Sequence, residues 1–275
     1  PQGKALDLQE SSCLQVFYSL VTGTNDYKDT ANSDIVVITA GLPRKPGMSR
    51  EDLLATNAKI VQSVTENIME HSRDPIVIVV SNPLDAMVYM AKKTGNLPKN
   101  KIIGMAGILD SARLRTFVAL ELGCSSVDVD AMVLGGHGDS MVPLPRYTTV
   151  SGISITELMT QEQIDRVVER TRKGGAEIVS LLKTGSAFYA PGASVVKMIE
   201  AILHDKRRIL PCTAYLEGEY DWSGIFFGVP VMMGIHGIEK VIELKLTDEE
   251  KAMLDISAQD VKKTCDEIDE ILKAG

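Results

Sequence analysis

Two short runs of mostly β-branched residues, Ile35 to Thr39 and Ile76 to Val80, constrain the fold of this chain more than any other feature. Runs of this length and composition are typical of strands that are buried on both faces of a parallel sheet. A helical pattern lies between them and begins at Ser49, with Asp52 as the capping-box partner. Because parallel strands are joined by crossover helices, this order predicts an α/β fold with a parallel sheet covered by helices.

The alternation of strand and helix continues to about Ile103, and the pattern changes near Gly107. A chain of 275 residues has enough core for two domains, so we predict a parallel-sheet domain over residues 1–107 and a second domain over residues 108–275. In the second part, residues 128–134 read as one strand. A terminal helix is expected to begin at the capping pair Thr247 and Glu250.

Composition excludes several classes of protein. No apolar run approaches the roughly eighteen residues of a membrane span, and a net charge of −8 without a basic run disfavours nucleic-acid and anionic-membrane partners. No histidine has zinc-site spacing to a cysteine or an acid, so no metal is expected. The four cysteines lie far apart and are predicted to be buried reduced thiols of a cytosolic protein: Cys13, Cys124, Cys212 and Cys265.

A histidine walled in by glycines, in the sequence Gly135-Gly136-His137-Gly138-Asp139, follows the apolar run at residues 128–134. Glycines let the backbone turn sharply and let another molecule approach closely. The imidazole is therefore expected to be accessible to a ligand and not packed in the core. An imidazole that titrates near neutral pH is suited to proton transfer. The alternative is a tight loop in which the histidine merely caps a strand.

Asp110 and Arg113 are three positions apart on a predicted helix and therefore share a face. One interpretation is a surface ion pair, which is the commoner outcome of this spacing. The other is that Asp110 accepts a hydrogen bond from an imidazole and fixes its tautomer, while Arg113 binds a carboxylate. In that case His137 is the candidate partner of Asp110.

Arg44 and Arg50 bracket a loop that contains two prolines and Gly47. Guanidinium groups match carboxylates with paired hydrogen bonds, so this loop suits a lid that closes over an anion. A solvated charged loop is the alternative. Ligands of parallel sheets bind at the carboxyl ends of the strands, where both this loop and Ser81-Asn82 are expected to lie.

Five motifs in order carry a resemblance to a known family: Thr39-Ala40-Gly41, the segment from Arg44 to Arg50, Ser81-Asn82-Pro83, the segment from Leu109 to Arg113, and Gly135 to Asp139. Together with Asn57 and residues 183–191, they resemble the malate dehydrogenases of the subgroup most similar to lactate dehydrogenases. The similarity runs along nearly the whole chain.

The resemblance implies a Rossmann-type parallel sheet domain that binds NAD, followed by an α+β catalytic domain. It implies reversible oxidation of (S)-malate to oxaloacetate, with His137 accepting the hydroxyl proton and Asp110 orienting the imidazole. Arg113 would bind the carboxylate beside the reacting carbon, Arg50 would polarise the carbonyl of oxaloacetate, and Arg44 would hold the distal carboxylate.

The resemblance also implies which residues bind the cofactor: Thr39, Ala40, Gly41, Asn57, Val80, Ser81 and Asn82. Asn82 would contact the substrate as well. A homo-oligomer, either a tetramer or a dimer, a cytoplasmic location and a part in the tricarboxylic acid cycle are implied as well. The alternatives are an L-lactate dehydrogenase or another 2-hydroxy acid dehydrogenase, and a non-catalytic anion-binding or scaffold protein that has lost its cofactor site.

The two carboxylates of malate give a physical reason for the assignment of Arg44. A malate dianion needs two cationic anchors and lactate needs one, because an unpartnered carboxylate in a closed site costs on the order of several kcal/mol. Arg44 therefore discriminates between the two substrates.

The family begins with a strand, a GxGxxG turn, a helix and a second strand that ends in an acidic residue, and none of these precedes Pro1. We expect that roughly 35 to 40 residues are missing upstream. The preference for NAD over NADP rests on the resemblance alone.

Overall fold

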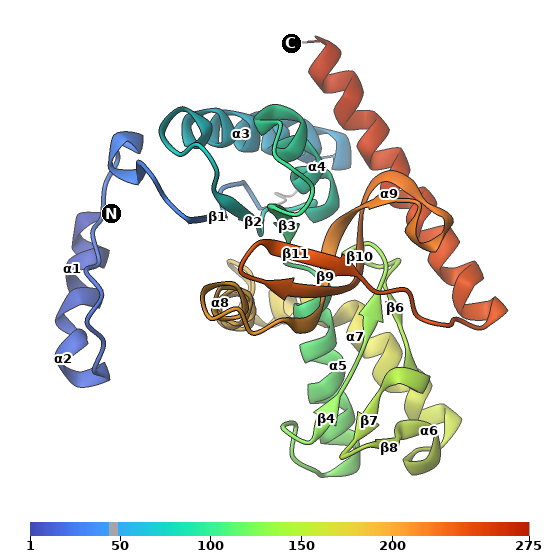
Figure 1. The fold of residues 1–275 in the computed structure, drawn as a ribbon. Helices are drawn as coiled ribbons and strands as arrows, with labels where there is room; N and C mark the ends of the chain where they lie inside the picture. The colour runs from blue at the N-terminus through green and yellow to red at the C-terminus, as the bar shows by residue number, and fades with distance from the viewer. Residues whose placement is uncertain (44–48, 275) are drawn as a thin grey trace.

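A mixed six-stranded sheet forms the centre of the molecule (Figure 1). The computed structural model describes residues 1–43 and 49–274. The first three strands of the sheet are parallel, as predicted, and the last three are antiparallel. In spatial order the strands are β1 (Ile35–Ile38), β2 (Ile76–Val79), β3 (Ile102–Gly104), β9 (Arg208–Glu217), β10 (Ser223–Gly234) and β11 (Gly237–Val241).

Helices cover both faces of this sheet. Figure 1 shows α3, α4 and α9 on one side, with α5 and α8 on the other. The longer helices are α3 (Arg50–His71), α4 (Leu84–Gly95), α5 (Gly107–Leu122), α7 (Gln161–Leu182), α8 (Tyr189–Leu203) and α9 (Asp248–Ala274). The shorter ones are α1 (Gln2–Glu10), α2 (Ser12–Gln15) and α6 (Ile155–Leu158), with 3₁₀ turns at Tyr27–Thr30, Pro145–Tyr147 and Glu219–Asp221.

The capping residues read from the sequence are confirmed. The Ser49 hydroxyl accepts from the Asp52 amide at 3.0 Å, and the Asp52 carboxylate accepts from the Ser49 amide at 3.3 Å. Thr247 and Glu250 make the same reciprocal pair at the start of α9, at 3.2 and 2.8 Å. Each pair satisfies amide donors that the first turn of a helix leaves without partners.

The single strand predicted for residues 128–134 is wrong. The segment forms two short strands, β4 (Val129–Asp130) and β5 (Val133–Leu134), that belong to different sheets. Strand β4 pairs with β7 (Thr149–Val150), which pairs in turn with β8 (Ile153–Ser154), whereas β5 pairs with β6 (Val142–Pro143). The chain changes partners here because β4 lies half exposed at the edge, while both residues of β5 are buried.

The central sheet crosses the predicted domain boundary near Gly107. Gly104 on β3 pairs with Thr213 on β9, so strands from the second part of the chain extend the parallel sheet. The larger hydrophobic cluster likewise draws residues from both parts, whereas a smaller one lies within the second part. The boundary itself stays a prediction.

The four cysteines carry free thiols. Cys212 and Cys265 are buried, as predicted, and Cys124 is half-buried. The prediction is wrong for Cys13, which is exposed because α2 lies apart from the sheet. Among the described residues, no helix combines the length and apolar character that crossing a bilayer requires.

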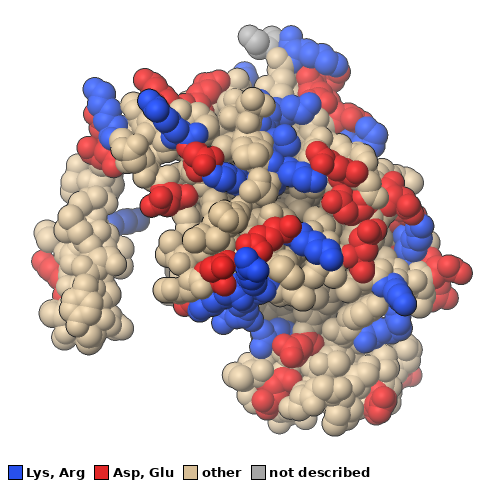
Figure 2. All heavy atoms as spheres, in the orientation of Figure 1, with Lys and Arg blue, Asp and Glu red and all other residues tan. Residues whose placement is uncertain are grey.

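The N-terminal arm, residues 1–20, stands apart from the rest of the molecule (Figure 1). Its apolar side chains are between 58% and 95% exposed at Leu6, Leu8, Leu14, Val16, Tyr18 and Leu20. Figure 2 shows few charged side chains on this arm. Exposed apolar surface of this kind is a mark of an interaction site.

Adding a methyl group at Gly104 tests the junction between β3 and β9. A Cβ there would lie 2.7 Å from Thr213 Cβ and 2.8 Å from Val88 Cγ2. We expect Gly104→Ala to lower the free energy of unfolding by about 1 to 3 kcal/mol, as overpacking of a core does, measured by urea denaturation. Gly3→Ala is the control, because a Cβ at Gly3 meets nothing within 4 Å. Equal stability of the two variants would contradict this account of the junction.

Candidate active site

The loops that follow β1 and β2 meet at the carboxyl edge of the parallel strands. The Ser81 hydroxyl donates to the Ala40 carbonyl at 2.5 Å. Asn57 of α3 is 1% exposed; its Oδ1 accepts from the Leu42 amide at 2.8 Å, and its Nδ2 donates to the Asn82 carbonyl at 2.7 Å. The side-chain amide of Asn57 bonds backbone groups of both loops and so holds the two loops together.

The structure thus brings the residues predicted for the cofactor side to one edge of the sheet. Thr39, Gly41 and Asn82 are exposed there, whereas Ala40 and Val80 are half-buried and Ser81 is buried. Gly41 has a φ of +154°, and a Cβ at this position would touch the Asn57 amide at 3.4 Å. At this edge, exposed residues therefore lie on loops that the hydrogen bonds of Asn57 and Ser81 hold in place.

The predicted contact between His137 and Asp110 is present. His137 follows β5, and its Nδ1 lies 2.8 Å from Asp110 Oδ2. A carboxylate only accepts hydrogen bonds, so Nδ1 carries the proton and Nε2 is left as an acceptor. The His137 side chain is 14% exposed and that of Asp110 is 3% exposed, so the ring has one accessible side and a buried anchor.

Arg113 completes the cluster from the next turn of α5. Its Nη1 donates to Asp110 Oδ1 at 3.0 Å, and its side chain is only 13% exposed, so the alternative of a surface ion pair is wrong. Among the residues that the structure describes, no acceptor lies within hydrogen-bond reach of the buried Arg113 Nε. Gly174 of α7 makes room for this side chain, since a Cβ there would lie 3.0 Å from Arg113 Cδ. Because Nε is enclosed, only the Nη donors that Asp110 does not use are open to an anion.

Neighbouring charges stabilise the protonated form of His137. Burial by itself lowers the pKa of the imidazole, but the charge and hydrogen bond of Asp110, together with the charge of Asp85, outweigh burial and raise the pKa above its ordinary value. The positive charge of Arg113 opposes them more weakly. The site is therefore suited to hold a proton taken up by the ring.

Three contacts that the sequence did not reveal hold the histidine loop. Asp85 Oδ2 accepts from the His137 amide at 2.9 Å, Ser257 Oγ accepts from the Gly136 amide at 2.9 Å, and the Gly228 carbonyl accepts from the Gly135 amide at 2.9 Å. Gly135 has a φ of +92°, which favours glycine. A carboxylate at Asp85 in an otherwise apolar stretch was the one available signal.

The arginine loop can be placed only in part. Arg44 lies outside the described residues, as does the side chain of Arg50, although Arg50 is the first residue of α3. The lid therefore stays a prediction.

Two further features bear on where ligands bind. Within the described ranges, no group of three His, Cys, Asp or Glu side chains is arranged to hold a metal ion. A cavity of about 500 Å³, lined by Asp34, Arg73 and His236 among others, opens at the amino ends of β1 and β2, away from His137.

Two family models match the chain. The NAD binding domain of lactate/malate dehydrogenases matches residues 1–104, and their alpha/beta C-terminal domain matches residues 108–272. Among relatives, the malate dehydrogenase of Heliobacterium modesticaldum is 58% identical over 262 residues, which cover 95% of this chain and 85% of the relative.

Solved structures agree with the sequence relatives. The malate dehydrogenase of Salinibacter ruber matches with a TM-score of 0.95 and 51% identity, over 100% of this chain and 88% of that one. The lactate dehydrogenase of Cryptosporidium parvum, solved with lactic acid and nicotinamide adenine dinucleotide, matches with a TM-score of 0.94 and 44% identity, over 98% and 86% of the two chains.

Removing the charge of Asp110 tests the electrostatics of the cluster. We expect Asp110→Asn to shift the titration midpoint of His137 to lower pH. Burial lowers the pKa of the imidazole, and the substitution removes the carboxylate charge that raises it. NMR titration of histidine-labelled protein measures this shift, and His137→Asn identifies the signal among the four histidines. Asp139→Asn, exposed in the same loop, should leave the midpoint in place. An unchanged midpoint in Asp110→Asn would show that the electrostatic account is wrong.

Proposed function

Because the chain belongs to the lactate/malate dehydrogenase family, we propose that it is an NAD-dependent malate dehydrogenase, which interconverts (S)-malate and oxaloacetate. The observation that carries this function is the buried contact of 2.8 Å between His137 Nδ1 and Asp110. It leaves Nε2 ready to accept a proton, next to a guanidinium that has Nη donors beyond the one given to Asp110.

His137 is the proton acceptor in our proposal. Bound NAD would supply the hydride acceptor for C2 of malate. As the hydroxyl oxygen becomes a carbonyl, its proton passes to His137 Nε2, and Asp110 stabilises the resulting imidazolium without moving. In the reverse direction, protonated His137 donates to the carbonyl oxygen of oxaloacetate. Malate oxidation therefore needs the neutral ring and oxaloacetate reduction needs the charged one.

Three arginines bind the substrate in this proposal. Arg113 takes the carboxylate beside the reacting carbon, and the Nη donors that it does not give to Asp110 support this role. The roles of Arg50, polarising the carbonyl, and Arg44, holding the distal carboxylate, rest on the resemblance.

The edge formed by residues 39–41 and 80–82 binds the cofactor in this proposal. The two loops are fixed to each other through Asn57 and Ser81, and Gly41 has no side chain that would fill the space above Asn57. Exposed Asn82 lies at the rim and would contact both cofactor and substrate. Ligands of parallel sheets bind at this edge.

A homo-oligomer belongs to the same proposal, as a dimer or a tetramer. The exposed apolar side chains of the N-terminal arm support it, because surfaces of this kind on soluble enzymes are usually covered by another chain. Exposed apolar residues on α8, among them Val196 and Leu203, offer a second such surface. The cytoplasmic location and the part in the tricarboxylic acid cycle rest on the resemblance alone.

Turnover of oxaloacetate and pyruvate by wild type and Arg44→Gln tests the substrate. With NADH consumption followed optically, we expect wild type to prefer oxaloacetate. Arg44→Gln should lower kcat/KM for oxaloacetate about 100-fold or more, because a charged partner of a buried carboxylate is lost, and should change pyruvate turnover far less. Equal losses on both substrates would remove Arg44 from its assigned role, and a preference for pyruvate would favour lactate dehydrogenase.

Sedimentation velocity tests the assembly. We expect a native mass two or four times the 29.9 kDa of the chain. Leu14→Glu, on the N-terminal arm, should weaken the assembly because it places a charge in an apolar contact. Leu120→Glu, which is also exposed (64%, against 81% for Leu14) but lies on α5, is the control. A monomer in wild type would refute the proposed assembly.

A further inference from the structure

A buried carboxylate that the mechanism does not use lies behind the histidine loop. Asp85, in the first turn of α4, is 7% exposed. Its Oδ2 accepts from the His137 backbone amide and its Oδ1 accepts from the Thr213 hydroxyl, each at 2.9 Å. Both oxygens thus face donors, which is the arrangement of an ionised carboxylate. A buried charge is retained only where such partners offset the loss of water.

We propose that Asp85 is a positioning residue, whose carboxylate ties the backbone of His137 to the segment that carries Asn82 and so fixes the proton acceptor relative to the cofactor edge. This inference rests on the proposed function. Asp85 follows Asn82 by three residues, at the point where the loop after β2 becomes α4. One side chain therefore links the two halves of the site.

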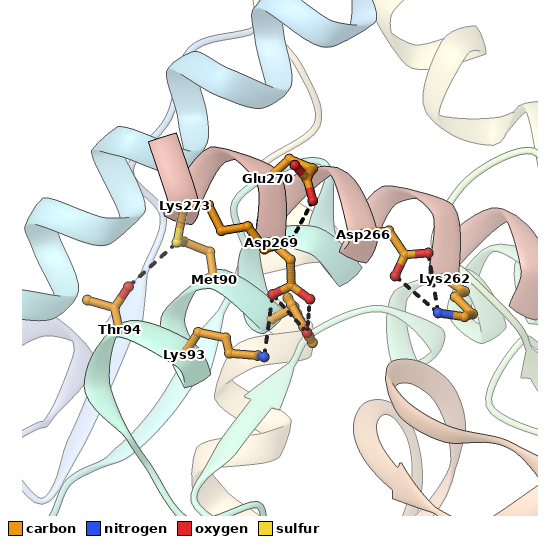
Figure 3. A network of polar contacts seen from close by, with 9 residues as sticks. Met90, Lys93, Thr94, Lys262, Asp266, Asp269, Glu270 and Lys273 are labelled. Carbon is orange, nitrogen blue, oxygen red and sulfur yellow. Dashed lines mark hydrogen bonds and ion pairs between the residues drawn. The ribbon is translucent and has the colours of Figure 1, made fainter. Parts of the chain in front are cut away.

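Contacts from α9 make this link rigid. The Tyr89 hydroxyl, one turn beyond Asp85 on α4, donates to Asp269 at 3.1 and 2.9 Å. Lys93 of α4 also faces Asp269 of α9 (Figure 3), and its Nζ lies 3.4 Å from the carboxylate. Helix α9 also supplies Ser257, whose hydroxyl accepts from the Gly136 amide. Helix α9 therefore contacts both α4 and the histidine loop. Asp85 adds a direct hydrogen bond between α4 and that loop.

The charge of Asp85 also acts on the ring. The charged groups that face His137 are Asp110 and Arg113 from α5 and Asp85 from α4. Burial, more than the nearby Asp85, raises the pKa of Cys265 on α9 to about 12, so this thiol stays neutral. The pKa of Asp85 is likewise above its ordinary value, because burial and the charge of Asp110 outweigh the contacts with His137 and Thr213, which lower it. These donors therefore favour the ionised form, which favours a protonated His137.

Two substitutions separate position from charge. Asp85→Asn keeps an acceptor for the His137 amide and removes the charge, so we expect the NMR titration midpoint of His137 to move to lower pH, with kcat above that midpoint within about threefold of wild type. Asp85→Ala removes the acceptor, so we expect kcat for malate oxidation on the alkaline plateau to fall about 10-fold or more, with KM changed less.

Asp266→Asn is the matched control, because it neutralises a carboxylate of α9 whose ion pair with Lys262 stays within that helix. It should leave both the His137 midpoint and the plateau kcat at wild-type values. Should circular dichroism show that Asp85→Ala does not fold, Thr213→Val replaces it. That variant removes the donor to Asp85 Oδ1, so kcat should fall by more than about threefold at an unchanged or lower His137 midpoint.

Wild-type kcat in Asp85→Ala, or in Thr213→Val where that variant replaces it, would overturn the positioning role, as would an equal loss in Asp266→Asn. A wild-type midpoint in Asp85→Asn would overturn the electrostatic part. The titration does not depend on turnover. If the wild-type enzyme did not interconvert malate and oxaloacetate, the proposed function would fail while the midpoint still reported on Asp85.

Discussion

The buried carboxylate of Asp110 is the constraint on which the rest of the site depends. A charge that is almost removed from water must be surrounded by donors, and His137 and Arg113 supply them from a loop and from the next turn of the same helix. In the proposed function, this partnership places the proton acceptor and an anion-binding group side by side. It also raises the affinity of the ring for a proton, so the electrostatics that stabilise the cluster are those that the chemistry uses.

Features that depend on neighbouring residues were predictable from the sequence. The capping pairs at Ser49 and Thr247 and the two parallel strands were read correctly, because each depends on side chains a few positions apart. The pairing of Asp110 with Arg113 follows from helical spacing in the same way. The contact with His137 spans 27 residues, and it was anticipated only because the two chemical groups complement each other.

Contacts between distant segments could not be predicted in this way. Asp85 and Thr213 are 128 positions apart, and Gly136 and Ser257 are 121 apart, so no local period relates them. The break of residues 128–134 into two strands likewise depends on which strands arrive beside it. The contacts of Asp85 and Ser257 position the histidine loop. The geometry of the motif at residues 135–139 therefore depends on long-range contacts that the sequence does not reveal.

The pairing of Gly104 with Thr213 has a mechanical consequence. A sheet that runs without interruption from β1 to β11, with a hydrophobic cluster common to both parts of the chain, opposes any hinge between them. Bending there would break ladder hydrogen bonds and expose core side chains together. A ligand can therefore approach His137 from the accessible side of its ring, while the framework beneath keeps His137, Asp110 and the edge at residues 80–82 in fixed positions.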